Sequence, residues 1–367
     1  ETRLLKRTDF NNDRVDSGDI GAGHTVTALY ELTLVGGDTL SYPLRYARKK
    51  TEGNVNAEFA FLRIRFKVKG DDRSKLIERS INDSDVITEG DDVPTDARFA
   101  AAAASTQQIK LGTSIVPTYP RHPLVMVQQA QVVAQLAPGR FRLGVGPSHR
   151  PTIESMGLEF DAPLAHLKEY LQILKAALQK GKVDFDGEHY QAHGAIYEPV
   201  DIDIMASALR KGSFELCGAE ADGAISWICP GTYLRDSALP AMEAGARKAG
   251  RPVVPPLIAH APVCVHENAS EVRGAVRDQL MNPSLPYYQR MLVAAGYPEA
   301  TEGVWSDAMI DGGVIWGDEA KAAEGIAELF AFGATEVLVS PITAGANTTA
   351  SLDRTMRLLG QAAGAAK

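Results

Sequence analysis

The hydrophobic periodicity of this chain changes near residue 100, and that change limits what the chain can fold into. In HTVTALYELTL (residues 24–34) and EFAFLRIRFKV (58–68), apolar residues alternate with mostly polar ones. A period of two is typical of antiparallel strands with one buried face and one face in water. Beyond residue 105, strand-like and helix-like segments alternate. That alternation predicts a parallel sheet covered by helices.

Six barrel-type strands are expected after residue 105, whereas a complete (β/α)8 barrel has eight. They are expected in IKLGTSIV, RFRLGVG, DIDIMASA, GAISWI, PPLIAHAPVCVH and TEVLVSP, of which the first is expected to be a buried strand. Helices are expected at 122–137, 164–180, 240–249, 270–280 and 318–332, and an Ala-rich helix in ARFAAAAAS (97–105). The predicted fold class is therefore α/β, an incomplete (β/α)8 TIM-type barrel preceded by a small antiparallel β-rich module. The predicted divisions are a β-rich module at 1–83, a linker and helix start at 84–100, and the barrel at 101–367.

Composition excludes several classes of partner. The 367-residue chain has a net charge of −8, whereas nucleic-acid binders need a basic surface. No run of 18 apolar residues is present, so no membrane-spanning helix is expected. The cysteines Cys217, Cys229 and Cys264 lie in apolar segments, which favours small buried side chains in a reducing cytoplasm over disulfides or metal ligands. The chain begins at Glu1 without a methionine, so a fragment of a longer protein stays open.

The stretch FRLGVGPSHRP (141–151) runs from a predicted strand into a Gly-rich turn. Gly144 and Gly146 lie near the carboxyl end of that strand, where barrel enzymes carry their ligand loops. Glycines let the backbone approach a ligand closely, and the exposed amide groups can bind anionic oxygen. A third glycine is absent, so the turn is not a dinucleotide fingerprint. On these residues alone, a cofactor turn and a packing turn both stay open, as do acid–base and surface roles for His149.

Other polar motifs have two interpretations each. Arg210–Lys211, after a predicted strand, could meet a phosphate or simply face solvent. The turn DFDGEHY (184–190) predicts a hairpin whose carboxylates solvate the turn rather than bind metal. DFNNDRVDSGDI (9–20) begins like a calcium loop, but Arg14 and Ile20 replace the required Gly and Glu. No metal site is therefore predicted, and no nucleophile elbow, P-loop or His-Glu-x-x-His motif occurs.

From about residue 102 to the C-terminus, the chain resembles the luciferase-like monooxygenase family of β/α barrels. The resemblance rests on IKLGTSIVPTYPRHPLVMVQQA, GRFRLGVGPSHRPTIESMGLEFDAP, HLKEYLQIL, VDFDGEHY and EADGAISW, which occur in the family's order. The GPSHRP turn is most similar to the subgroup that uses the deazaflavin coenzyme F420 instead of FMN. The resemblance implies hydride transfer or oxygen insertion on a small organic substrate.

The same resemblance implies the roles of individual residues. Ser114–Ile115 would match the strand-end bulge, often with a cis peptide, that backs the cofactor ring. Gly146, Pro147, Ser148 and His149 would flank the ring and phosphate, with His149 as the catalytic residue near the reacting face. The phosphate loop would be formed by Ser207, Ala208, Leu209 and Arg210. The family usually has Gly or Gly-Pro where this chain has Arg210–Lys211, which adds cationic charge but removes close backbone approach.

Residues 1–99 depart from the barrel family. DFNNDRVDSGDIGAGHTVTALYEL and AFLRIRFK resemble the C-terminal domain that follows a von Willebrand factor A domain in a bacterial family. The first two barrel strands, which in the luciferase-like family carry a frequent catalytic His or acid, would have to precede residue 100. A fusion of the two families would produce such a junction.

We therefore expect an F420- or FMN-dependent oxidoreductase. Whether the loss of the first barrel strands impairs its activity stays open. The alternative is a non-catalytic interaction protein with a vestigial barrel. The expected partner is a small molecule, with no nucleic acid and no membrane, and a homodimer stays open.

Overall fold

The computed structural model describes residues 60–66, 73, 75–81, 106–196 and 198–365. The chain divides into two compact units, Glu1–Gln107 and Gln108–Lys367. In the first unit, strands β1 (Ala60–Phe66) and β2 (Lys75–Ile81) form an antiparallel pair. The strand expected in EFAFLRIRFKV is thus confirmed, and β2 is an addition to the prediction. The expected strand at 24–34, the calcium-like stretch 9–20, the linker at 84–96 and the Ala-rich helix at 97–105 lie outside the described residues.

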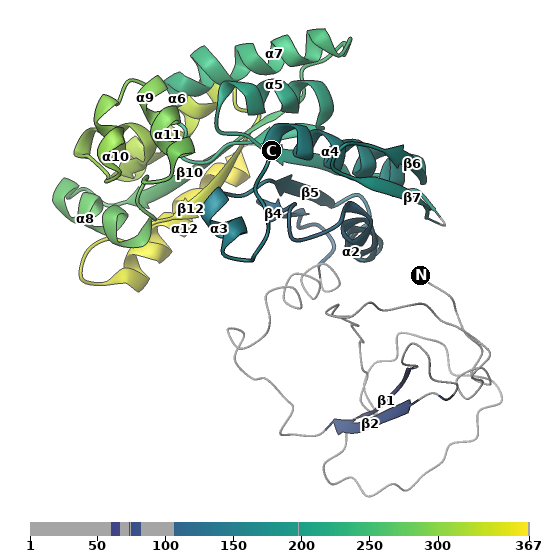
Figure 1. Ribbon diagram of the computed structural model, residues 1–367. Coiled ribbons are helices and arrows are strands. Elements are labelled where there is room, and N and C mark those ends of the chain that lie inside the picture. Colours follow the sequence, from purple (N-terminus) through teal and green to yellow (C-terminus); the bar gives the residue numbers. More distant parts are fainter. Residues whose placement is uncertain (1–59, 67–72, 74, 82–105, 197, 366–367) are drawn as a thin grey trace, which may run out of the picture. The chain divides into compact units, whose positions relative to one another are not determined.

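The second unit is built on one parallel sheet (Figure 1). Its strands follow the order β11-β10-β9-β8-β5-β3, with β12 also paired to β10 and β4 to β5. The bounds are β3 (Leu111–Gly112), β4 (Val116–Pro117), β5 (Phe141–Gly146), β8 (Asp203–Ser207), β9 (Gly223–Ile225), β10 (Leu257–Val265), β11 (Ile315–Gly317) and β12 (Glu336–Pro341). All six predicted barrel strands are present, β3 and β4 forming one interrupted strand, and β11 is additional. The incomplete barrel is confirmed.

Helices connect the strands and cover the outside of the sheet (Figure 1). They are α2 (Pro123–Leu136), α3 (Arg150–Glu154), α4 (Pro163–Lys180), α5 (Lys211–Glu220), α6 (Gly231–Tyr233), the π-helix η4 (Leu234–Ala238), α7 (Leu239–Lys248), α8 (Ala269–Gln279), α9 (Pro286–Ala294), the 3-10 helix η5 (Pro298–Glu302), α10 (Asp307–Gly313), α11 (Glu319–Ala331) and α12 (Thr348–Ala365). The predicted helices correspond to α2, α4, α7, α8 and α11. Within the described residues, no helix combines the length and apolar character needed to cross a bilayer.

The leucine-rich helix α4 and the hairpin after it follow the sequence prediction. Leu167, Leu171 and Leu174 are fully buried, and the helix ends at Gly181, whose φ of 82° favours glycine. Strands β6 (Lys182–Asp186) and β7 (Gln191–Ala195) form the expected antiparallel hairpin. Glu169 on α4 binds the hairpin turn by accepting hydrogen bonds from the backbone N–H groups of residues 188, 189 and 190.

Small residues on the inner face of the partial barrel leave space at the carboxyl ends of the strands, next to a layer of packed apolar side chains. Successive residues of a strand point to opposite faces, so Met205 shares a face with Ser207, and Ile258 with His260. Met205, Ile225 and Ile258 form a buried cluster against which Leu338 packs. On β5 the corresponding inner positions include Gly144, which is paired with Met205. The inner face is therefore filled at its amino end and open at its carboxyl end.

The first barrel strand is not buried, and this expectation from the sequence is wrong. Ile109 is 58% exposed and Ile115 is 36% exposed. Within the described residues, β3 and β4 pair only with β5, so this strand is an edge of the sheet. At the other end, β12 pairs only with β10 within the same residues, and its side chains are mostly half-buried. An edge strand exposes side chains that a closed barrel would bury.

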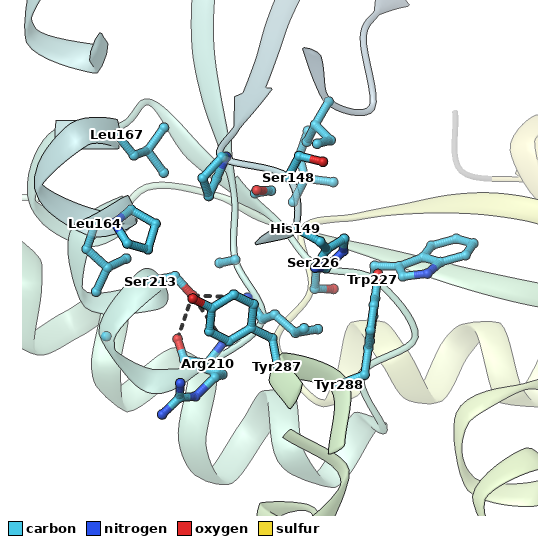
Figure 2. Close-up of a pocket in the computed structure, with 18 of the residues that line it drawn as sticks. Ser148, His149, Leu164, Leu167, Arg210, Ser213, Ser226, Trp227, Tyr287 and Tyr288 are labelled. Carbon is cyan, nitrogen blue, oxygen red and sulfur yellow. Dashed lines mark hydrogen bonds between the residues drawn. The ribbon is translucent and has the colours of Figure 1, made fainter. Parts of the chain in front are cut away.

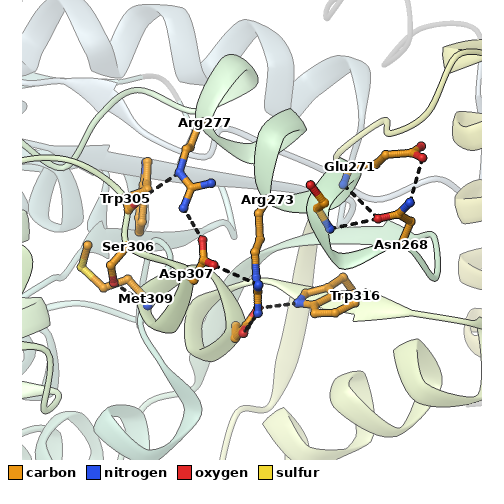
Figure 3. Close-up of polar contacts among 11 residues, drawn as sticks. Asn268, Glu271, Arg273, Arg277, Trp305, Ser306, Asp307, Met309 and Trp316 are labelled. Carbon is orange, nitrogen blue, oxygen red and sulfur yellow. Dashed lines mark hydrogen bonds and ion pairs between the residues drawn. The ribbon is translucent and has the colours of Figure 1, made fainter.

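An ion-pair network joins helices α8 and α10, which both lie between β10 and β11 in the chain (Figure 3). Arg273 on α8 donates to Asp307 at 2.9 Å and to Asp311 at 2.5 Å, both on α10. Arg277, one turn further along α8, also donates to Asp307 and to the backbone oxygen of Trp305. The pairs are largely exposed, so each contributes little stability alone. Together they join the two helices between which α9 lies in the chain.

Helices α5 and α7 lie side by side on the outside of the sheet because each presents a glycine to the other (Figure 1). A Cβ atom on Gly218 would lie 2.1 Å from the backbone oxygen of Met242. A Cβ atom on Gly245 would lie 2.0 Å from the backbone oxygen of Glu215. Since backbone atoms cannot rotate away, either Cβ would push the two helices apart.

We expect Gly218→Ala and Gly245→Ala to lower the free energy of unfolding by about 1–3 kcal/mol each, the usual cost of overpacking. Urea unfolding monitored by circular dichroism measures the effect. Gly274→Ala on α8 is the matched control, because no atom lies within 4 Å of its added Cβ. There the better helix propensity of Ala should raise stability by roughly 0.5–1 kcal/mol. Equal effects at the three positions would contradict the packing described.

Candidate active site

A cavity of about 740 Å³ lies at the carboxyl end of the partial barrel (Figure 2). Its walls include the segments that directly follow β5, β8 and β9, and the interruption between β3 and β4. Nine of the ten residues predicted for the site line it: Ser114, Ile115, Pro147, Ser148, His149, Ser207, Ala208, Leu209 and Arg210. The structure thus brings these residues together, and their individual roles stay predictions.

The bulge predicted at Ser114–Ile115 is present as the break between β3 and β4. Thr113 fastens it to β5: its Oγ1 donates to the Gly144 oxygen at 2.9 Å and accepts from the Gly144 N–H at 2.8 Å. Ser114 and Ile115 are thereby turned towards the cavity that they line. Every peptide bond in the described residues is trans, so the cis peptide that the resemblance suggests is not found there.

The turn after β5 requires glycine at one end and holds strain at the other. A Cβ atom on Gly146 would lie 2.1 Å from Ser207 Oγ, so Gly146, the tenth predicted residue, lets β8 present its serine to the cavity. Ser148 has a φ of 62°, in the left-handed region that non-glycine residues seldom adopt. Such strain is found at ligand-binding turns. The geometry of the turn therefore favours a ligand-binding turn over a packing turn.

The loop after β8 is held by its own side chains at the start of α5. Ser213 Oγ accepts hydrogen bonds from the backbone N–H groups of Leu209 and Arg210, at 3.1 and 3.0 Å. Tyr233 donates to the Leu209 backbone oxygen at 3.3 Å. Arg210 itself lies over the ring of Tyr287, 5.8 Å from the ring centre. The loop is rigid at its backbone and carries one cationic side chain into the cavity wall.

His149 lies between the Gly-rich turn and helix α9. Its ring centre is 5.1 Å from that of Tyr288 and 6.4 Å from that of Tyr287. Burial lowers the pKa of His149 from the ordinary histidine value of 6.5, so the imidazole is neutral at pH 7. Its Nδ1 is buried and has no hydrogen-bond partner among the described residues. A neutral imidazole with one unused nitrogen can accept or donate a proton.

Thirteen further lining residues are missing from the prediction, and four of them carry aromatic rings: Trp227, His260, Tyr287 and Tyr288. His260 Nδ1 is 3.2 Å from Ser114 Oγ, and its Nε2 is 2.8 Å from Ser340 Oγ. Burial lowers the pKa of His260 to about 4. The sequence offers little signal for it, because it lies inside an apolar strand; only its place two residues after Ile258 assigns it to the inner face. The two tyrosines belong to α9, a helix absent from the prediction.

Two family models match the chain. The family described as luciferase-like monooxygenase matches residues 96–336. The description "Uncharacterized protein YfbK, C-terminal" matches residues 1–126. The two matched ranges overlap between residues 96 and 126, around the place where the hydrophobic periodicity changes.

Curated relatives match part of the chain. An F420-dependent glucose-6-phosphate dehydrogenase of Nocardia farcinica is 35% identical over 167 residues, which are 43% of this chain and 50% of the relative. A 5,10-methylenetetrahydromethanopterin reductase of Methanolobus tindarius is 29% identical over 48% of this chain and 54% of the relative. The chain spans about half the length of the curated relatives it matches.

Solved structures share the fold over a longer range. An F420-dependent secondary alcohol dehydrogenase in complex with an F420-acetone adduct has a TM-score of 0.60 at 16% identity, over 72% of this chain and 83% of that one. The coenzyme F420 dependent tetrahydromethanopterin reductase from Methanopyrus kandleri has a TM-score of 0.57 at 20% identity, over 74% and 87%. At these identities the likeness concerns the fold alone.

The contact between Gly146 and Ser207 predicts a coupled pair. Gly146→Ala should lower the free energy of unfolding by about 1–3 kcal/mol, because the new Cβ meets Ser207 Oγ. Ser207→Ala removes that oxygen, so Gly146→Ala should cost clearly less in the Ser207→Ala background. A double-mutant cycle by urea unfolding measures the coupling, expected at about 0.5 kcal/mol or more. Additive effects would show that the two strands do not approach as described.

Proposed function

The chain belongs to the luciferase-like monooxygenase family, and from this premise we propose that it is an oxidoreductase that uses coenzyme F420, with FMN as the alternative cofactor, on a small organic substrate. The proposal rests on one observation: nine of the ten predicted site residues, the catalytic candidate His149 included, line the same cavity. These residues come from three separate segments of the chain. Their convergence supports a cofactor site at the carboxyl end of the barrel, where β/α barrels place their chemistry.

The residues present fit a ring cofactor with a phosphate-bearing tail. A cavity of about 740 Å³ is within the usual range of about 300–1,000 Å³ for small-molecule sites. Ile115 and the Gly146–His149 turn offer a narrow wall for a flat ring. The first amide groups of α5 and the Arg210 guanidinium offer donors and positive charge for a phosphate. When bound, the deazaflavin or flavin ring supplies the acceptor or donor of hydride.

In this proposal His149 handles the proton of the reaction. If the substrate is an alcohol, its oxidation to a carbonyl would remove a hydride from carbon, for which the bound ring would be the acceptor, and would release the hydroxyl proton. The neutral imidazole of His149 is a base that can take that proton, and in the reverse direction it returns it. The Ser114–His260–Ser340 chain orients Ser114, whose hydroxyl lines the cavity.

The finer assignments are proposals as well. We propose that residues 1–99 form a module like the C-terminal domain that follows a von Willebrand factor A domain, which the match of residues 1–126 supports. We also propose a cytoplasmic location, supported by cysteines that are free and buried: Cys217, Cys229 and Cys264. No observation in the described part of the chain favours the alternative of a non-catalytic interaction protein.

Titration of the purified full chain with F420 and, separately, with FMN tests the cofactor proposal. We expect saturable binding in the micromolar range to one of them, followed by cofactor fluorescence. Arg210→Ala should raise the Kd about tenfold and weaken its dependence on salt, because one charge-assisted contact to phosphate is lost. Arg247→Ala, on the exposed surface of α7, is the matched control and should leave the Kd unchanged. A folded chain that binds neither cofactor would refute the proposal.

The pKa of His149 provides a second test that needs no substrate. We expect its NMR titration midpoint to lie below 6.5, because burial disfavours the charged imidazole. Between that midpoint and 6.5 the unfolded chain binds more protons at this residue, so folding stability falls as the pH is lowered through this window.

His149→Gln identifies the resonance of His149. His193 is the internal reference: hydrogen bonding to Asp184 raises its pKa above 6.5, opposite to the shift of His149. A midpoint for His149 above 6.5 would contradict its placement as a neutral base.

A further inference from the structure

The described part of the cavity wall carries a single charged side chain. Among the described residues that line it, Arg210 is the only one charged at pH 7, and none is an aspartate or glutamate. His149 and His260 are neutral, since burial lowers the pKa of both. The proposed function assigns Arg210 to the cofactor phosphate. No cation on the described walls then remains for an anionic substrate.

The side of the cavity away from Arg210 is aromatic. Figure 2 shows Trp227 and Tyr288 on the opposite side from Arg210, with Tyr287 between them. The ring of Trp227 meets that of His260 edge-on, with 4.2 Å between the ring centres. Burial raises the pKa of Tyr288 to about 12, so its hydroxyl stays neutral. These rings offer a large apolar surface with neutral hydrogen-bonding groups.

The aromatic wall has support from outside the cavity. Tyr287 and Tyr288 belong to α9, which lies in the chain between α8 and α10, and these two helices are joined by the ion pairs of Arg273 and Arg277 with Asp307 (Figure 3). Helix α9 itself is linked to η5, where Gln289 donates to the Thr301 backbone oxygen at 3.2 Å.

From this arrangement we infer that the pocket takes an uncharged organic substrate, with an apolar body and one hydroxyl or carbonyl group, rather than a sugar phosphate or a carboxylate. The inference rests on the proposed function and deepens it. An anion against this wall would lose its water without gaining a cation, which is costly. An apolar body would gain by covering the rings of Trp227 and Tyr288, which lie away from Arg210, whereas the ring of Tyr287 lies next to it.

Three probes test the inference: cyclohexanol, trans-4-hydroxycyclohexane-1-carboxylate and glucose 6-phosphate. The first two share one ring and one hydroxyl and differ by a carboxylate. Binding to the full chain is measured by tryptophan fluorescence, with and without F420, and Trp227→Phe shows which part of the signal comes from the pocket. Loss of F420 absorbance measures turnover, in which the carbinol hydride and the hydroxyl proton leave cyclohexanol as cyclohexanone forms.

In the F420-loaded chain, where the cofactor phosphate would occupy Arg210, we expect cyclohexanol to bind at least tenfold more tightly than either anion and to be the probe that reduces F420. Tyr288→Lys places a cation on the aromatic wall and should shift the preference at least tenfold towards the carboxylate. Met356→Lys, on the exposed surface of α12, is the matched control and should leave it unchanged. If Tyr288→Lys does not fold, the comparison of the three probes on the unmodified chain decides alone.

Equal or tighter binding of either anion to the F420-loaded chain would overturn the inference, and so would the absence of saturable cyclohexanol binding in both the free and the F420-loaded chain. Failure of the proposed function has a different signature, because neither F420 nor FMN then binds to the folded chain.

Discussion

The cavity depends on how closely β5 can lie against its neighbours. At Gly144 a side chain would meet the Thr113 backbone oxygen at 2.3 Å, and at Gly146 it would meet Ser207 Oγ at 2.1 Å. Because both positions lack a Cβ, the bulge on one side and β8 on the other can close around the end of β5. The same two glycines free the space that larger inner residues fill elsewhere on the sheet. One local constraint therefore sets the shape of the bulge, the turn and the loop after β8 together.

Two polar links join distant strands across the inner face of the partial barrel. At the amino end, Arg142 on β5 donates to Glu336 at the start of β12, at 2.7 Å. At the carboxyl end, His260 on β10 lies between Ser114 of the bulge and Ser340 of β12. These links connect β5 and the bulge to β12 through side chains, where a complete barrel would close its sheet through backbone hydrogen bonds. They help to explain how a sheet with open edges keeps a curved inner face and a cavity.

The sequence predicted the strands and the glycine turn well because these depend on local signals. Apolar runs of strand length and glycines at strand ends are visible in one pass along the chain. His260 and Trp227 could not be found in that way, because their place in the site follows from strand register and from which face is inner. The exposure of the first barrel strand was missed for a related reason. An apolar strand has the same sequence whether its neighbour is present or absent, and only the sheet order shows that Ile109 and Ile115 are exposed.

The exposed edges carry features that reduce the risk of pairing with another chain. The strand formed by β3 and β4 is broken by the bulge, and each piece is two residues long. Pro117 ends it, and Pro341 ends β12 at the other edge. Proline cannot donate to a further strand, and a bulge interrupts a continuous row of backbone donors. The bulge at Thr113–Ile115 therefore has two effects on the first barrel strand. It turns Ser114 towards the cavity, and it keeps this edge too short and irregular to pair with a strand of another chain.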